Sequence, residues 1–183
     1  VPPGWTLERP LIPEQLRRKA LSWANGEYDG PKTALTVSCS PSDGSHTGVG
    51  KSSLAAAVAR HIAEQRKLTI TWVHASDLRG DHDDPQVPRD ALRRLLRAPL
   101  SVLDGPGKEL GGAHDVRGWQ PARMPVIMEY AARMYENDGG IRITTLDLPG
   151  KTLGEVYGLD LVRRFGRINP QSKREENATI IML

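Results

Sequence analysis

The chain has 183 residues, 38% of them hydrophobic, with a formal net charge of +3, and this size suits one ordinary domain with a full core. No apolar run is long enough to span a bilayer, and we find no basic start followed by an apolar signal segment, so we do not expect a membrane-spanning protein. Cys39 is the single cysteine, which excludes a disulfide-rich fold. We therefore expect a soluble, cytoplasmic protein in which Cys39 is a buried structural thiol.

The first 30 residues are punctuated by prolines and then become helical. From 13 to 24 the spacing places Leu16, Ala20 and Trp23 on one side, which predicts an amphipathic helix that ends at Asn25. Since the sequence begins with Val1 rather than Met, we expect a removed initiator or a missing N-terminal segment. Such a segment could carry a separate partner-binding domain.

A glycine-rich turn between a predicted strand at 33–39 and a predicted Ala-rich helix at 53–64 is the most informative feature. Gly50 lets the backbone approach a ligand closely, Lys51 brings a positive charge to the β and γ phosphates, and Ser52 offers a hydroxyl to Mg²⁺. The following helix N-terminus attracts anions as well. We predict a nucleotide site made by Ser45, His46, Thr47, Gly48, Val49, Gly50, Lys51, Ser52 and Ser53.

The loop departs from the strict phosphate-loop pattern at one position. Five residues before Gly50 the pattern has glycine, whereas this chain has Ser45, with Gly44 one place earlier. We therefore expect a slightly lengthened loop in which His46 is solvated rather than catalytic. The alternative, a flexible loop with an incidental lysine, does not explain the flanking strand and helix.

A second strand is predicted at 68–75, followed by a short turn at 76–77, an acidic loop at 81–85 and a helix at 89–97. The acidic loop could be read as a metal site around His82, but Pro85 and the lack of further ligands favour a solvated loop. The arginines of the helix, together with other arginine pairs in the chain, favour a partner that carries phosphate, although they also suit an ordinary solvated surface.

The third predicted strand, 99–104, is apolar and ends on Asp104. A carboxylate at this position can hold the water shell of Mg²⁺ opposite Ser52. Many ATPases have a glutamate directly after such an aspartate to orient the attacking water, and this chain has Gly105 there. Glu109 could reach the site if the turn folds back, but an ordinary surface glutamate is the simpler interpretation, so we expect slow hydrolysis by the chain alone.

After a glycine-rich stretch at 105–112, the pattern predicts a helix at 122–136 whose methionines are core residues, a strand at 141–145, a helix at 152–165 and a last strand at 178–183. Strands alternate with helices along the chain. We therefore predict an α/β fold of the P-loop NTPase class, with a mainly parallel five-stranded sheet sandwiched by helices in one domain over 1–183.

The ordered motifs resemble the DnaC-like bacterial helicase loaders of the AAA+ superfamily, which also include IstB-like transposition helper ATPases. The resemblance spans roughly 13–165. Four segments carry it: the phosphate loop that runs into 54–57, the strand segment 95–104, the segment 143–147 and the segment 153–165. The third resembles the family's Thr-Thr-Asn sensor segment, and the fourth resembles its Tyr-Gly-Glu-Arg segment with a downstream arginine.

The resemblance implies catalytic roles for Lys51, Asp104 and three further residues. The sensor position falls on Asp147, where the family has asparagine. Arg163 or Arg164 would stabilise the γ-phosphate bound by an adjacent subunit, and Asp160 stands where the family usually has arginine. The alternative for the two arginines is a surface pair at a helix end, where the helix dipole favours cations.

The resemblance further implies that the ligands are ATP and Mg²⁺, and that Ser52 and Asp104 bind the metal. It also implies self-association through the ATP site, with a replicative helicase and single-stranded DNA as partners. No motif for guanine selection is present, so the resemblance alone favours ATP over GTP. Trp119 could stack on a DNA strand or pack under its own loop. The candidate DNA-binding cations are Arg93, Arg94, Arg97, Lys108, Arg117 and Arg123.

Three other functions remain open at this point. A transposition helper would share the fold and differ in its partner. A P-loop small-molecule kinase could use the arginines of 89–97 as a lid, but it leaves the 143–147 segment and the Tyr157-Gly158 pair without a role. A nucleotide-binding adaptor that never hydrolyses ATP is suggested by Gly105.

Overall fold

The computed structural model describes residues 12–27, 33–38, 50–78, 86–106, 130, 140–146 and, by the backbone alone, 179–182. The predicted helix at 152–165 lies outside these residues, as does Cys39. Of the predicted helix at 122–136 only Tyr130 is described, and it is helical and fully buried. No helix in the described part of the chain has the length and apolar character needed to span a membrane.

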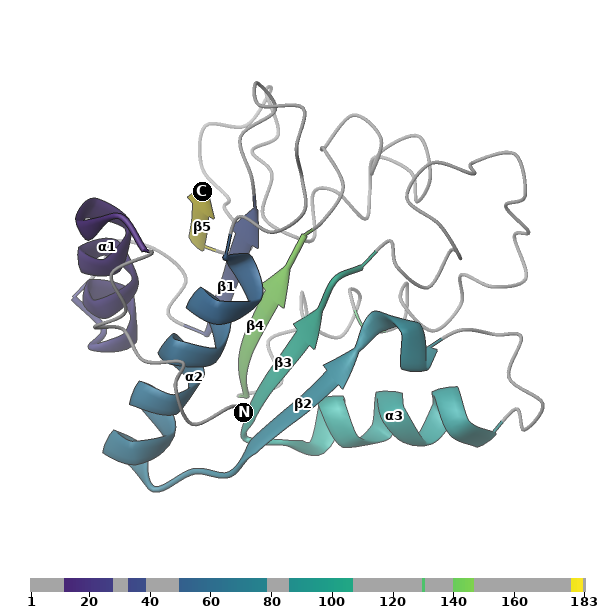
Figure 1. The fold of residues 1–183 in the computed structure, drawn as a ribbon. Helices are drawn as coiled ribbons and strands as arrows, with labels where there is room; N and C mark the ends of the chain where they lie inside the picture. Colours follow the sequence, from purple (N-terminus) through teal and green to yellow (C-terminus); the bar gives the residue numbers. More distant parts are fainter. Residues whose placement is uncertain are drawn as a thin grey trace, which may run out of the picture.

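The centre of the fold is a five-stranded sheet, as the sequence predicts (Figure 1). Its strands are β1 (Ala34–Ser38), β2 (Ile70–His74), β3 (Leu100–Asp104), β4 (Ile141–Thr145) and β5 (Thr179–Met182). They pair in the order β2-β3-β4-β1-β5, and every pairing is parallel. All carboxyl ends therefore lie at one edge of the sheet, where ligands bind in open α/β sheets.

The helices are α1 (Glu14–Ala24), α2 (Lys51–Arg66), the 3-10 helix η2 (Ala75–Leu78) and α3 (Gln86–Arg97). α2 begins two residues before its predicted start because Gly50, with a φ of 94°, is already its N-cap. α3 begins three residues before its predicted start. Pro88 fits in its first turn, since a proline lacks only an N–H group that has no partner inside the helix at that position.

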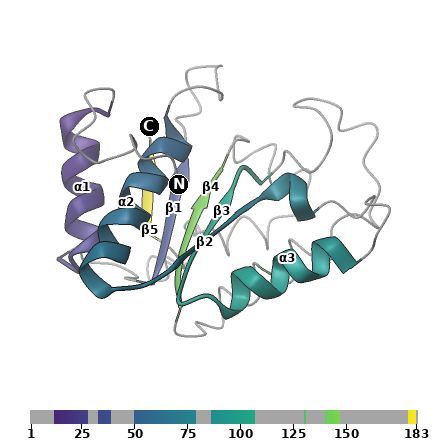
Figure 2. The same ribbon diagram turned by 60° about the horizontal axis from the view of Figure 1, so that its bottom comes forward.

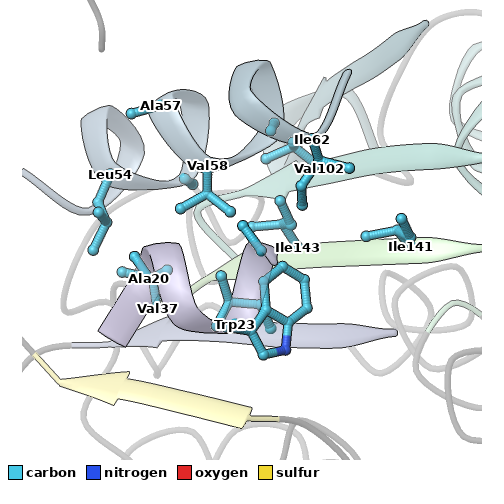
Figure 3. Packing of buried hydrophobic residues seen from close by; sticks show 14 of the residues in the cluster. Ala20, Trp23, Val37, Leu54, Ala57, Val58, Ile62, Val102, Ile141 and Ile143 are labelled. Carbon is cyan, nitrogen blue, oxygen red and sulfur yellow. The ribbon is translucent and has the colours of Figure 1, made fainter. Parts of the chain in front are cut away.

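The larger core lies between the sheet and the α1–α2 pair. Trp23 of α1, Val58 of α2 and Ile143 of β4 are fully or almost fully buried and meet there (Figure 3). Along β3, Leu100 and Val102 belong to this cluster, which places the alternate residues of that strand on the other face.

α3 covers that other face. It packs on β2 and β3 through buried side chains, and Figure 2 shows it on the opposite side of the strands from α1 and α2. The sheet is therefore the middle layer of the predicted sandwich.

Arg142 is a buried charge on the α3 face of the sheet, where it is only 3% exposed. Its Nη1 donates to the carbonyl of Ala98 at 2.6 Å and its Nη2 to the carbonyl of Leu96 at 2.9 Å. Gly140 leaves room for the guanidinium, because a Cβ at this position would collide with it. The side chain thus caps the C-terminal end of α3 and complements the negative end of the helix dipole.

Candidate nucleotide-binding site

The N-terminal end of α2 is the first half of the site. Gly50 has a φ of 94°, in the left-handed region where a residue with a Cβ is strained. The first backbone hydrogen bond of the helix runs from the N–H of Leu54 to the carbonyl of Gly50 at 2.9 Å. The backbone N–H groups within the first turn of α2 therefore point out of the N-terminal end of the helix, which is the arrangement that binds phosphate.

Lys51 and Ser52 are the first two residues of α2. Lys51 is 4% exposed, so its charge lies inside the protein and not in bulk solvent. The hydroxyl of Ser52 donates a 2.7 Å hydrogen bond to Oδ1 of Asp104, 52 residues further along the chain. The fold therefore brings together the two residues that the sequence assigned to Mg²⁺.

Asp104 is the second half of the site and lies at the carboxyl end of β3, 4% exposed. Its Oδ1 accepts a second hydrogen bond, 2.7 Å long, from Oγ1 of Thr145 at the end of the adjacent strand β4. The hydroxyl of Thr145 in turn accepts from the backbone N–H of Gly105 at 2.8 Å. Thr145 thereby links the carboxylate to the backbone that follows it.

The other carboxylate oxygen, Oδ2, faces β2. Nδ1 of His74 lies 3.2 Å from it, and the imidazole side chain is 56% exposed. His74 and Asp104 are register partners in the parallel β2–β3 pair, so the sheet itself places them side by side. The carboxylate is thus contacted from α2, β2 and β4.

The donor set fits Mg²⁺. This ion prefers oxygen ligands, keeps several of its waters, and is commonly held by one or two protein groups together with substrate phosphates. A hydroxyl and a carboxylate oxygen 2.7 Å apart, beside a helix N-terminus, match that pattern. Within the described ranges no cluster of three or more His, Cys, Asp or Glu side chains could hold a metal by itself, and the acidic loop at 81–85 lies outside those ranges.

Most of the other predicted site residues lie outside the described residues. Ser53 is half-buried in the first turn of α2, next to the residues that the structure brings together. The remainder of the phosphate loop, the implied sensor residue, the two implied trans-acting arginines and half of the DNA-binding cations are not described. These are Ser45, His46, Thr47, Gly48, Val49, Asp147, Arg163, Arg164, Lys108, Arg117 and Arg123.

Sequence reasoning missed two residues of the site, His74 and Thr145. Each is the last residue of an observed strand, β2 or β4, and carries a side chain with hydrogen-bonding groups. Because parallel strands end at a common edge, their position next to the strand of Asp104 could have identified them once the strand order was known. That order is not contained in the local pattern of either strand.

The three predicted DNA-binding arginines that the structure describes form an exposed surface on α3. Arg93, Arg94 and Arg97 are all exposed, and Arg93 pairs with Asp90 at 3.2 Å. Only two residues separate Arg97 from the start of β3, so the C-terminal end of α3 lies at the amino edge of the sheet. These arginines are therefore at the opposite edge from Asp104.

No protein-family model matches the chain, and no curated protein matches it. The fold does match solved structures. One is "Crystal structure of the DnaC helicase loader", with a TM-score of 0.65, 18% identity, and coverage of 98% of this chain and 97% of that chain. Another is "Crystal Structure of the DnaI", with a TM-score of 0.59, 20% identity, and coverage of 100% and 90% respectively.

The replication initiator DnaA from Aquifex aeolicus, solved with bound AMPPCP, matches with a TM-score of 0.62 and 16% identity over 100% of this chain. The chain spans half the length of that DnaA structure, since 50% of it is covered. At these identities the similarity establishes the fold. The shared fold agrees with the α/β fold and mainly parallel five-stranded sheet predicted from the sequence.

Proposed function

We propose that this chain binds ATP with Mg²⁺ and acts as a AAA+ ATPase that helps to load a replicative helicase onto DNA. The observation that carries the nucleotide part is the 2.7 Å contact between Ser52 Oγ and Asp104 Oδ1 at the N-terminal end of α2. A hydroxyl and a carboxylate meeting beside a helix N-terminus suit a phosphate–Mg²⁺ ligand. The fold shared with the DnaC, DnaI and DnaA structures supports the same assignment.

Different residues would bind the phosphates and the Mg²⁺ ion. The N-terminal turn of α2 and Lys51 would hold the phosphates, with Gly50 keeping the backbone close enough for its N–H groups to donate. Ser52 and Asp104 would hold the Mg²⁺, which when bound neutralises charge on the β and γ phosphates. Because Lys51 and Asp104 are both 4% exposed, their charges are weakly screened by solvent.

The proposal for hydrolysis differs from that for binding. Gly105 follows Asp104 and has no side chain to orient water, so turnover by a single chain would be slow. We assign water positioning to Asp147 and completion of the site to Arg163 or Arg164 from a neighbouring subunit. ATP would then act as an assembly ligand, because it binds the assembled state more tightly than the free chain.

The loader assignment rests on the comparison and on α3. The similarity extends over 97% of the DnaC helicase loader structure but over only 50% of the first DnaA structure. The exposed arginines of α3, at the edge of the sheet away from Asp104, would contact a single-stranded DNA backbone while nucleotide is bound.

A nucleotide-binding experiment tests the first part. Titration with a fluorescent ATP analogue and Mg²⁺ should give saturable binding to the native chain, and Lys51→Ala should abolish it. Lys19→Ala, which removes an exposed lysine of α1, is the matched control and should bind like the native chain. Equal binding by all three proteins would overturn the nucleotide assignment.

A loading experiment tests the second part. Turnover of ATP and helicase recruitment should be measured with single-stranded DNA, with and without a replicative helicase. We expect turnover that is low for the chain alone and raised by DNA and helicase together. A response to a transposase instead of the helicase would move the assignment to a transposition helper, and phosphate transfer to a small acceptor would move it to a kinase.

A further inference from the structure

His74 contacts the Asp104 carboxylate from the edge strand of the sheet. Its Nδ1 lies 3.2 Å from Oδ2, on the carboxylate oxygen that neither hydroxyl of the site reaches. At this distance an N–H on Nδ1 can donate to the carboxylate, which has no hydrogen of its own to donate. The two oxygens of Asp104 therefore have separate partners: Oδ1 accepts from Ser52 and Thr145, and Oδ2 lies beside Nδ1 of His74.

The imidazole also contacts an aromatic ring on its own strand. The rings of Trp72 and His74 contact each other edge to face, with centroids 6.2 Å apart and planes at 61°. Trp72 is two residues earlier on the same face of β2 and packs against the α1–α2 core. A continuous set of contacts thus runs from the core through Trp72 and His74 to Asp104.

We propose that His74 is a positioning residue of the nucleotide site, which holds the Asp104 carboxylate so that Oδ1 faces Ser52 and the Mg²⁺ position. This inference rests on the proposed nucleotide function. The terminal torsion of an aspartate is a broad, roughly two-fold rotor, so the backbone alone does not decide which oxygen faces Ser52. A donor on Oδ2 restricts that rotation before any ligand arrives.

The exposure of His74 separates this role from a purely structural one. With its side chain 56% exposed, the imidazole buries little area of its own, and Oδ1 of the buried Asp104 carboxylate keeps its bonds to Ser52 and Thr145 when the imidazole is removed. Partners that orient the ligands of a metal, in contrast, typically change metal affinity or activity 10- to 100-fold when they are removed. Loss of His74 should therefore affect Mg²⁺ dependence far more than melting temperature.

The test compares His74→Ala and His74→Asn with the native chain. The amide nitrogen of asparagine can occupy the place of Nδ1 and donate to Oδ2, whereas alanine cannot. The measurement is the Mg²⁺ concentration that half-saturates binding of a fluorescent ATP analogue, beside binding of the same analogue in EDTA. We expect about a tenfold rise for His74→Ala, substantial recovery for His74→Asn, and unchanged binding in EDTA.

His61→Ala is the matched control, because this histidine of α2 bonds to Asn25 at 3.1 Å and does not contact Asp104. It should leave the Mg²⁺ dependence unchanged. Two results would overturn this inference without affecting the proposed function, provided that both variants melt like the native chain. One is a half-saturating Mg²⁺ concentration for His74→Ala equal to that of the native chain, and the other is no recovery of Mg²⁺ affinity in His74→Asn. Absence of nucleotide binding by the native chain would overturn the proposed function and the inference together.

Discussion

Asp104 and Arg142 are two buried charges at opposite edges of one sheet, and their partners differ in kind. Asp104, at the carboxyl end of β3, is held by the side chains of Ser52, Thr145 and His74. Arg142, at the amino end of β4, is held mainly by the backbone carbonyls of Leu96 and Ala98. The first set consists of side chains around the proposed ligand site, whereas the second set is part of the helix end itself.

The difference indicates what each charge does. The partners of Asp104 are side chains at the edge of the sheet where ligands bind in such folds, and its Ser52 partner can turn from the carboxylate to a metal. Carbonyls at the end of α3 lose their donor if Arg142 leaves, and a buried acceptor without a donor is costly. We therefore expect changes at Arg142 to lower stability and changes around Asp104 to lower ligand affinity.

The largest effect on stability should come from Arg142→Met. It keeps a long apolar side chain but removes the donors to Leu96 and Ala98, so we expect the free energy of unfolding to fall by about 3 kcal/mol. Denaturant unfolding measures this. Arg94→Met, an exposed arginine on α3, is the control and should change stability by no more than about 0.5 kcal/mol. A similar small loss for Arg142→Met would contradict the capping role.

The next effect should come from Asp104→Asn. It preserves the shape of the side chain but removes the negative charge, so we expect the half-saturating Mg²⁺ concentration for nucleotide binding to rise by about 10- to 100-fold. Titration of a fluorescent ATP analogue at increasing Mg²⁺ gives the value. Unfolding free energy should change less than in Arg142→Met. A fall in unfolding free energy as large as that of Arg142→Met, with little change in the half-saturating Mg²⁺ concentration, would contradict the expectation that Asp104 serves ligand binding and Arg142 serves stability.

Thr145→Val should have a smaller and mixed effect, because Thr145 serves both the site and the fold. Its hydroxyl donates to Asp104 and accepts from Gly105, so the substitution leaves a buried N–H without its acceptor and should cost about 1 to 2 kcal/mol. Thermal melting and Mg²⁺ titration check both effects. Thr145→Ser keeps the hydroxyl and should restore Mg²⁺ dependence; if it does not, the hydroxyl is not the group that matters.

The smallest effect should come from Glu14→Gln, on the exposed face of α1. A hydrogen bond from Arg18 and the charge of Arg17 hold the pKa of Glu14 below its ordinary value. A lowered carboxyl pKa in the folded state stabilises above the unfolded-state pKa, and this contribution is lost as the pH falls through the lowered value. Melting temperatures of the native chain and the variant should therefore differ slightly at pH 7 and converge in acid. A gap that persists at pH 2 would contradict this origin.

The two charges also differ in whether their roles could be predicted from the sequence. Asp104 could be recognised, because a carboxylate at the end of an apolar strand, downstream of a phosphate loop, is a local pattern with a chemical meaning. Arg142 could not be interpreted in the same way. Within the strand of 141–145 an arginine flanked by isoleucines is typical of a half-exposed strand, with the charged side chain in solvent.

The partners of both charges depend on strand order. His74 lies beside Asp104 because β2 pairs with β3, and Thr145 lies beside it because β4 occupies the next position. Arg142 reaches the end of α3 because β4 pairs with β3, although the two segments are more than forty residues apart. Neither the β2–β3 pairing nor the β3–β4 pairing can be predicted from the hydrophobic periodicity of the individual strands.

The sequence by itself was enough to predict the five strands and α1, α2 and α3 to within a few residues, and to propose the phosphate-binding turn at Gly50 and Lys51 and the roles of Ser52 and Asp104. Each of these predictions rests on residue type and spacing over a few neighbouring positions. Only the tertiary structure decided that Ser52 meets Asp104 at 2.7 Å, that His74 and Thr145 complete the carboxylate's surroundings, and that Arg142 is buried. The physical reason is that such contacts arise from parallel pairing of strands distant in sequence, whereas propensity and periodicity act over one turn or a few residues.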